Sequence, residues 1–232
     1  MRFIYRRDFL KTAAVAALPG SPRAAAERPN ILLLMSDQHR GDCLGADGNR
    51  VIQTPNLDHL AAGGVRFRCA YSSTPTCTPA RAALLTGMSP WSHGMLGYAV
   101  VAGHYRVELP QLLRDAGYYT LGIGKMHWTP QRGLHGFHRT ILDESGREES
   151  PGFRSDYRSW LFSEAPNANP EPTGISWNGY ASKAFPLPER LHPTAWIAET
   201  AIHFLRDYNR SEPWFLKVSF ERPHSPYDPP PR

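Results

Sequence analysis

The 232-residue sequence has no apolar run long enough to cross a bilayer. A membrane-spanning helix needs about 20 mainly apolar residues. The apolar stretch Thr12–Leu18 is far shorter than that, and no later segment is longer. The sequence therefore predicts no stable membrane span.

Cysteine is also scarce, with three in all: Cys43, Cys69 and Cys77. An odd number excludes a fully paired disulfide framework. A single Cys43–Cys69 bridge stays open as an alternative, and it would leave Cys77 alone. The function of Cys77 has to be judged from its neighbours.

A strongly basic surface is missing from most of the chain. The formal net charge is +5, but residues 1–26 hold five basic residues against one acidic residue. The rest of the chain is therefore nearly neutral. A neutral body has no electrostatic footprint for a polyanion, so we expect no nucleic-acid partner.

The first 27 residues have the pattern of an export signal. The segment Tyr5–Lys11 contains Arg6 and Arg7 and resembles a twin-arginine signal. A short apolar stretch follows, and then the small residues Ala24–Ala26 of a cleavage site. We assign residues 1–27 to this signal and expect a bacterial protein, periplasmic or secreted, that is carried by the twin-arginine (Tat) export machinery.

Beyond residue 28, apolar strand patterns alternate with helical ones. The expected strands are 31–35, 65–71, 118–123 and 214–220, and the expected helices are 54–63, 78–85, 109–116 and 194–208. The uninterrupted run 31–35 is typical of a central strand buried on both faces. This alternation predicts an α/β fold with a mostly parallel sheet and helices on both faces. Residues 129–190 are rich in Pro, Gly, Ser and Asn, and we expect an irregular insertion on the substrate side.

Three polar residues stand at or just past the ends of predicted strands: Asp37, Lys125 and His224. In parallel sheets, ligands gather at the carboxyl ends of the strands. We therefore expect these side chains to lie close together in a binding site.

The segment around Cys77 predicts an anion site. Pro79 suits the first turn of a helix, with Thr78 as the N-cap. Cys77 would then lie just before a helix N-terminus, where unpaired N–H groups favour an anion. Arg81, on the first turn, would face the same space. A nucleophile, an arginine and a helix end together indicate an oxyanion-binding site.

Four motifs then resemble those of the sulfatase family, in the same order. Residues 77–87 and 117–127 resemble its two signatures, residues 29–38 its first strand and metal-binding turn, and residues 223–227 its later histidine motif. The resemblance covers residue 28 to the end. It implies an alkaline-phosphatase-like α/β sandwich, of which residues 28–232 would be the N-terminal part, apparently truncated at the C-terminus.

The resemblance implies a covalent mechanism at Cys77. In this family a formylglycine-generating enzyme oxidises the motif cysteine to formylglycine, whose hydrate carries two hydroxyls. One attacks sulfur and displaces the alcohol, and the other then loses its proton so that sulfate is expelled. We therefore expect a sulfuric ester hydrolase acting on sulfate monoesters of a carbohydrate or an aryl alcohol.

The resemblance also implies a metal. Asp37, Gln38 and the modified Cys77 would be its ligands, and oxygen donors suit a hard cation such as Ca²⁺, with Mg²⁺ or Mn²⁺ as alternatives. The cation would polarise the sulfate oxygens. Many relatives carry a second Asp where this chain has Gln38, so the negative charge here is lower.

The resemblance also implies roles for four further residues, by their positions in the matching motifs. Arg81 would hold the hydrate oxygen and the carboxylates beside the metal. Lys125 and His127 would bind hydrate and sulfate oxygens. His224 would contact the sulfate ester and help protonate the leaving oxygen.

Two other interpretations stay open. A phosphate or phosphonate monoester hydrolase of the same superfamily could use the same site, and the Asp37–Gln38 turn suits either. An inactive truncated fragment is the other, because Ca²⁺ takes six to eight oxygen ligands and no further metal-binding motif follows His224.

Overall fold

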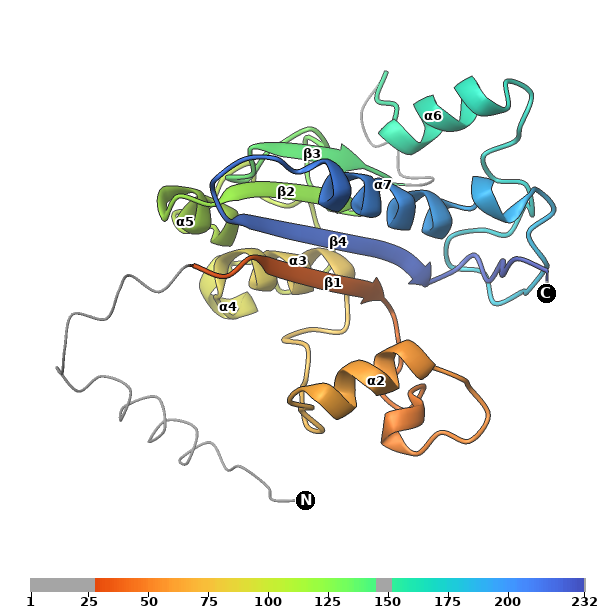
Figure 1. The fold of residues 1–232 in the computed structure, drawn as a ribbon, viewed down its shortest axis with the longest axis horizontal. Coiled ribbons are helices and arrows are strands. Elements are labelled where there is room, and N and C mark those ends of the chain that lie inside the picture. The colour runs from red at the N-terminus through yellow and green to blue at the C-terminus, as the bar shows by residue number, and fades with distance from the viewer. Residues whose placement is uncertain (1–27, 145–151, 232) are drawn as a thin grey trace, which may run out of the picture.

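A computed structural model describes residues 28–144 and 152–231. The predicted export signal, residues 1–27, lies outside the described residues. A single four-stranded sheet with the order β1-β4-β2-β3 forms the centre, and every neighbouring pair is parallel (Figure 1). Its strands are β1 (Ile31–Asp37), β2 (Tyr119–Gly124), β3 (Arg139–Leu142) and β4 (Trp214–Pro223). The predicted α/β class with a parallel sheet is confirmed.

Helices lie on both faces of this sheet. The helices of the described residues are α2 (Pro55–Gly63), which lies apart from the sheet, α3 (Cys77–Thr86), α4 (Pro90–His93), α5 (Leu109–Asp115), α6 (Asp156–Glu164) and α7 (Pro193–Asp207), with the short 3₁₀ helices η1 (Gly45–Asp47) and η2 (Glu189–Leu191). Helices α3 and α5 contribute to the core on one face, and α6 and α7 to the core on the other. Within the described ranges, none of these helices combines the length and apolar character that a membrane span requires.

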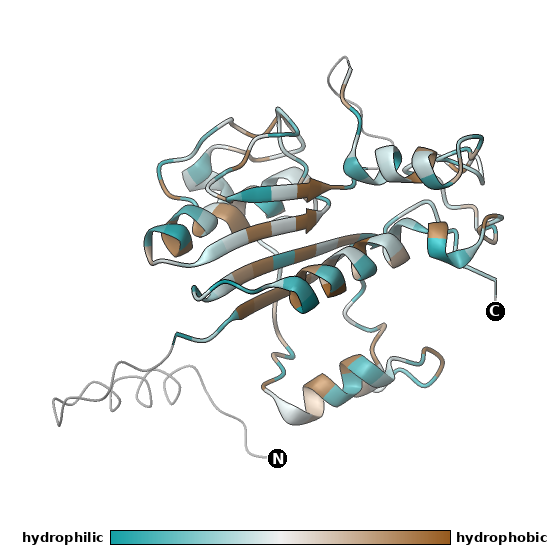
Figure 2. Ribbon diagram, turned by 45° about the horizontal axis from the view of Figure 1, so that its top comes forward, coloured by the Kyte–Doolittle hydropathy of each residue, from teal (hydrophilic) through white to brown (hydrophobic). Residues whose placement is uncertain are grey.

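Strand β4 contributes to both hydrophobic cores. Phe215 packs with Leu85 of α3 in one cluster, while Leu216 and Val218 pack with Ile197 of α7 in the other. Successive strand side chains point to opposite faces, so one apolar strand can serve two layers. Each such side chain contributes about 1.5–3 kcal/mol when fully buried. Figure 2 shows the hydrophobic stretches of the strands lying between the helices.

The predicted central position of the first strand is wrong. In the described part of the chain, β1 is an edge strand that pairs with β4 alone. Ile31 and Leu33 pack against a core cluster, but Leu32 and Leu34 are 45% and 53% exposed. An apolar run predicts a strand, but it does not show whether both faces are covered.

The predicted strand at 65–71 is also wrong. This segment has no strand in the structure, and Val65, Phe67 and Tyr71 are 74%, 74% and 89% exposed. Helix α2 just before it forms where expected, with Pro55 as its first residue, but none of its residues is buried. Alternating apolar residues produce a strand only where a neighbouring strand can accept the hydrogen bonds.

The segment 129–190 has more regular structure than its composition indicated. It contributes β3, α6 and η2. Leu142 and Leu161 are fully buried and Phe185 is 2% exposed. These scattered apolar residues pack in the cores on either face of the sheet.

The alternative of a Cys43–Cys69 disulfide is not realised, because all three cysteines, which lie in the described part, are free thiols.

Candidate active site

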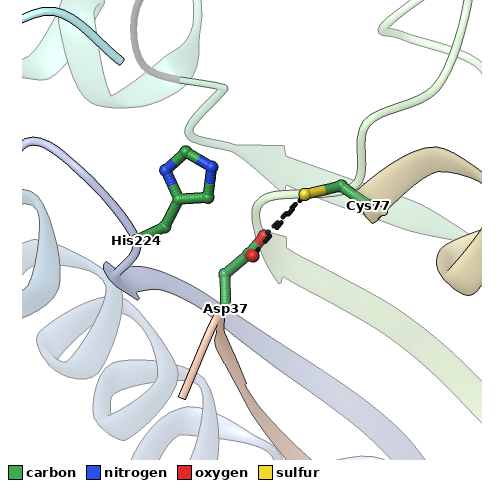
Figure 3. Close-up of side chains that lie close together, drawn as sticks. All are labelled: Asp37, Cys77 and His224. Carbon is green, nitrogen blue, oxygen red and sulfur yellow. Dashed lines mark hydrogen bonds between the residues drawn. The ribbon is translucent and has the colours of Figure 1, made fainter. Parts of the chain in front are cut away.

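The three predicted strand-end residues meet at one edge of the sheet. Asp37 is the last residue of β1, Lys125 follows β2, and His224 follows β4. The ligand atoms of Asp37, Cys77 and His224 all lie within 4.8 Å of one another. Figure 3 shows these three side chains converging from β1, from the start of α3 and from the segment after β4. Lys125 Nζ lies 2.6 Å from Asp37 Oδ2, so the expected proximity of the three strand-end side chains is confirmed.

Cys77 lies at the N-terminus of α3. The helix begins two residues earlier in the chain than the sequence predicted. Thr76, not Thr78, is the N-cap, so Cys77 is the first helical residue and Pro79 the third. Proline is tolerated throughout a first turn, because the N–H groups there have no partner within the helix. The Cys77 thiol lies 3.6 Å and 3.7 Å from the two carboxylate oxygens of Asp37.

Asp37 is buried between two cations. Its Oδ2 accepts a hydrogen bond from Lys125 Nζ at 2.6 Å and another from Arg81 Nη2 at 3.0 Å. Burial alone raises the pKa of this carboxyl, but the charges of Lys125 and Arg81 outweigh it and hold the pKa well below its usual value. The cluster therefore carries one carboxylate against two cations. The surplus positive charge beside Cys77 favours an anionic ligand.

Arg81 connects three elements of the fold. It is 2% exposed. Besides Asp37, its Nη1 donates to the carbonyl oxygen of Lys125 at 2.6 Å and to Ser219 Oγ at 3.0 Å. These contacts fix the guanidinium of α3 against β2 and β4. The sequence did not single out Ser219, although a serine at a strand position between apolar residues is a signal for a buried hydrogen bond.

The turn after β2 places Lys125. Gly124 has a φ of +88°, and a Cβ at this position would lie 2.2 Å from the carbonyl oxygen of Ser219. Only glycine fits such a close approach without strain. The next N–H, of Lys125, donates to that same oxygen at 2.9 Å. Lys125 Nζ then lies 4.0 Å from Cys77 Sγ.

Glu144 supports the turn that carries His127. Its Oε1 accepts the backbone N–H groups of both Met126 and His127, each at 2.7 Å. His127 itself has a φ of +67°, which is uncommon for a residue with a side chain. Burial raises the pKa of Glu144, although these two N–H groups act in the opposite direction. Sequence reasoning missed Glu144; its place two residues after β3 was the one available signal.

The two site histidines have different surroundings. Nε2 of His127 lies 3.3 Å from the hydroxyl oxygen of Tyr98. Nδ1 of His224 lies 2.8 Å from the carbonyl oxygen of Ser225, so Nδ1 carries the proton and donates it. That bond orients the His224 ring and leaves Nε2 as its second functional atom.

Five of the predicted site residues line a cavity of about 950 Å³: Asp37, Gln38, Cys77, Arg81 and His224. Lys125 and His127 are not part of its lining. Gln38 is exposed and has a φ of +59°. Asp37 and Gln38 offer oxygen donors of the kind that a hard cation prefers. The ligand atoms of Asp37, Cys77 and His224 also lie close enough together to hold a metal ion, and of these three the Asp37 carboxylate is the donor that fits a hard cation.

This chain resembles known proteins in both sequence and fold. Residues 29–232 match the sequence profile of the family described as Sulfatase. An arylsulfatase of Clostridium perfringens is 43% identical over 216 residues, which are 88% of this chain and 45% of that protein. An N-acetylglucosamine-6-O-sulfatase of Bacteroides thetaiotaomicron is 30% identical over 224 residues, 96% of this chain and 36% of that protein. The crystal structure of a phosphonate monoester hydrolase of Agrobacterium radiobacter superposes with a TM-score of 0.68 at 31% identity, covering 88% of this chain and 42% of that one.

The fold and site define an α/β protein of the alkaline-phosphatase-like type, with a cluster of buried charged side chains at the ends of its parallel strands. The chain belongs to the sulfatase family. It spans less than half the length of the three relatives described above.

Proposed function

We propose that this protein hydrolyses sulfate monoesters and that Cys77, once converted to formylglycine by a formylglycine-generating enzyme, is the site of the nucleophile. The observation that carries the proposal is the position of Cys77. Cys77 is the first residue of a helix and borders a cavity. Beside it lie two buried cations, Arg81 and Lys125, whose combined charge of +2 exceeds the single negative charge of Asp37. The hydrated aldehyde would supply one hydroxyl for attack on sulfur and a second for expelling sulfate.

Arg81 and Lys125 bind the anion in this proposal. Their side chains are 1% exposed, so little water screens their charges. Both are fixed in advance, Arg81 by Ser219 and Lys125 by Asp37. Charges that are already oriented stabilise a developing negative charge without the cost of reorganisation.

The histidines act on the ester itself. His224, when protonated on both ring nitrogens, gives the Nε2 proton to the leaving alcohol oxygen, because its side chain borders the cavity and its Nδ1–H is held by the Ser225 carbonyl. His127 binds a sulfate oxygen. Glu144 and Tyr98 position it for this role.

A divalent cation belongs to the proposal as well. Asp37, Gln38 and the residue derived from Cys77 would hold it, and we propose Ca²⁺ because the donors are oxygens. When bound, such a cation polarises the sulfate oxygens.

We also propose export by the twin-arginine route to the periplasm or beyond, on the strength of residues 1–27 alone.

The decisive test replaces Cys77 in the full-length protein, produced together with the modifying enzyme. Cys77→Ala should lower the turnover of 4-nitrophenyl sulfate by at least about a thousandfold, because the nucleophile is gone. Cys69→Ala is the matched control, since Cys69 is exposed and lies outside the cavity lining. Undiminished turnover in Cys77→Ala would refute the assignment. So would finding only unmodified thiol at Cys77 in active protein by mass spectrometry.

A second candidate function is the hydrolysis of phosphonate monoesters. The structural likeness to a phosphonate monoester hydrolase favours it, while the Asp37–Gln38 turn suits either function. The same assay decides between the two functions. We expect kcat/KM for 4-nitrophenyl sulfate to exceed that for 4-nitrophenyl phenylphosphonate by about tenfold or more, and the opposite order would favour the second function.

A further inference from the structure

Trp177 lies on the wall of the cavity that holds Cys77. It belongs to the segment between α6 and η2, far from the site motifs in sequence. This segment is tied to the site by Ser225, whose hydroxyl lies 2.9 Å from the carbonyl oxygen of Ser176 and 2.7 Å from that of Gly179. One serine next to His224 thus contacts the residues on both sides of Trp177.

The indole ring is also held by its neighbours. Its centroid is 6.1 Å from that of the His224 ring. The Arg222 guanidinium carbon lies 5.9 Å from the indole centroid, close enough for a cation–π contact. Arg222 is fixed in turn by Asp228, with contacts of 2.7 Å and 3.0 Å. Trp177 is only partly buried and lines the cavity, so an oriented aromatic side chain borders it.

A second aromatic side chain lies at the other site histidine. Tyr98 lines the same cavity and is 60% exposed. Its ring centroid is 5.7 Å from that of His127. The cavity, at about 950 Å³, is large enough for a whole drug-sized ligand. A sulfate group would fill a small part of it, so most of the space remains for the alcohol.

We propose that Trp177 forms the subsite for the alcohol moiety and that this moiety contains a ring, aryl or pyranose, whose flat face packs on the indole. The inference rests on the proposed function and adds the residue that selects for a ring in the alcohol. A flat ring matches an aromatic face over its full area, whereas a short alkyl chain contacts little of it. Because Trp177 is already oriented, little ordering cost offsets the contact.

The test measures binding in a protein that cannot turn over. Cys77→Ala protein is titrated by calorimetry with 4-nitrophenyl sulfate, glucose 6-sulfate and ethyl sulfate. Adding Trp177→Ala should weaken the binding of one or both ring esters by about tenfold and that of ethyl sulfate by less than about twofold. The two ring esters separate aryl from sugar preference. Trp177→Phe should retain most of the affinity.

The matched control is Tyr180→Ala on the same background. Tyr180 belongs to the same segment and is 91% exposed, but it does not line the cavity, so its removal should change no affinity. Equal weakening of all three esters by Trp177→Ala, or weakening of none, overturns the inference. Failure of the proposed function is a separate outcome: it appears as absence of turnover in protein with Cys77 intact and modified.

Discussion

Charged side chains are buried at the strand ends, whereas large apolar side chains are exposed along residues 51–71. Asp37, Arg81 and Lys125 are 7%, 2% and 0% exposed, and each contacts residues from other elements. By contrast, Val51 is 92% exposed and Phe67 is 74% exposed. Helix α2, in the middle of this stretch, lies apart from the sheet in Figures 1 and 2.

This difference shows that burial follows contacts between elements rather than the polarity of single residues. Asp37, Arg81 and Lys125 each have an oppositely charged or hydrogen-bonding partner on another strand or on α3. Such pairs tolerate burial only because the partners are in place. The apolar residues of 51–71 have no comparable neighbour in the described ranges, so their side chains contribute little to the free energy of unfolding.

The largest expected effect comes from removing the carboxylate between the two buried cations. Asp37→Asn leaves Lys125 and Arg81 without their counter-charge, and we expect the free energy of unfolding to fall by about 3–5 kcal/mol. Urea denaturation at neutral pH measures this. The exposed carboxylate of Asp42, which pairs with Arg40 at 2.5 Å, is the matched control, and Asp42→Asn should have no measurable effect.

The pH dependence of the free energy of unfolding tests the same ion pair in a second way. The pKa of Asp37 is lowered in the folded state, so its stabilisation is present above the unfolded value of about 3.9 and is lost as the pH falls from there toward the folded pKa. Asp37→Asn should therefore lose less stability than the natural protein on acidification below about pH 4. Identical acid profiles would contradict the ion-pair assignment.

A smaller effect is expected at Glu144. Glu144→Gln keeps a side-chain oxygen that can accept hydrogen bonds from the Met126 and His127 N–H groups. Glu144→Ala removes this acceptor and leaves both N–H groups buried without it. We expect Ala to cost about 1–3 kcal/mol more than Gln in the free energy of unfolding. Equal stabilities of the two variants would show that these hydrogen bonds do not hold the His127 turn.

The Glu144 carboxyl of the natural protein should also make the free energy of unfolding depend on pH. Burial raises the folded pKa of Glu144, so the folded state binds a proton more tightly than the unfolded state. The stability that this proton contributes is present below the unfolded value of about 4.3 and is lost as the pH rises through the folded pKa. Glu144→Gln should lack that loss, which denaturation between pH 4 and neutrality can measure.

The sequence was sufficient for the residues that follow predicted strands. Asp37, Lys125 and His224 could be grouped because parallel strands end at one edge of a sheet. The helix beginning at Cys77 was found from Pro79, although the N-cap lay two residues earlier. In both cases the signal was local: an apolar run, a terminating polar residue, or a proline in a first turn.

Ser219 and Glu144 could not be found in this way, since their roles depend on contacts between distant elements. Ser219 acts through Arg81, which is 138 residues away along the chain. Glu144 acts on backbone N–H groups after β2. The edge position of β1 has the same cause, because the neighbours of a strand are a property of the whole sheet and not of its own residues.

The smallest expected effect tests the exposed region. Leu60 of α2 is 60% exposed, and Leu60→Glu should change the free energy of unfolding by no more than about 0.5 kcal/mol. Leu161 of α6 is fully buried and serves as the contrast, because Leu161→Ala should cost about 2–5 kcal/mol. Urea denaturation of both variants measures the difference. If Leu60→Glu costs as much as Leu161→Ala, then α2 packs against another surface in solution, and the contrast between a buried polar site and an exposed apolar segment does not hold.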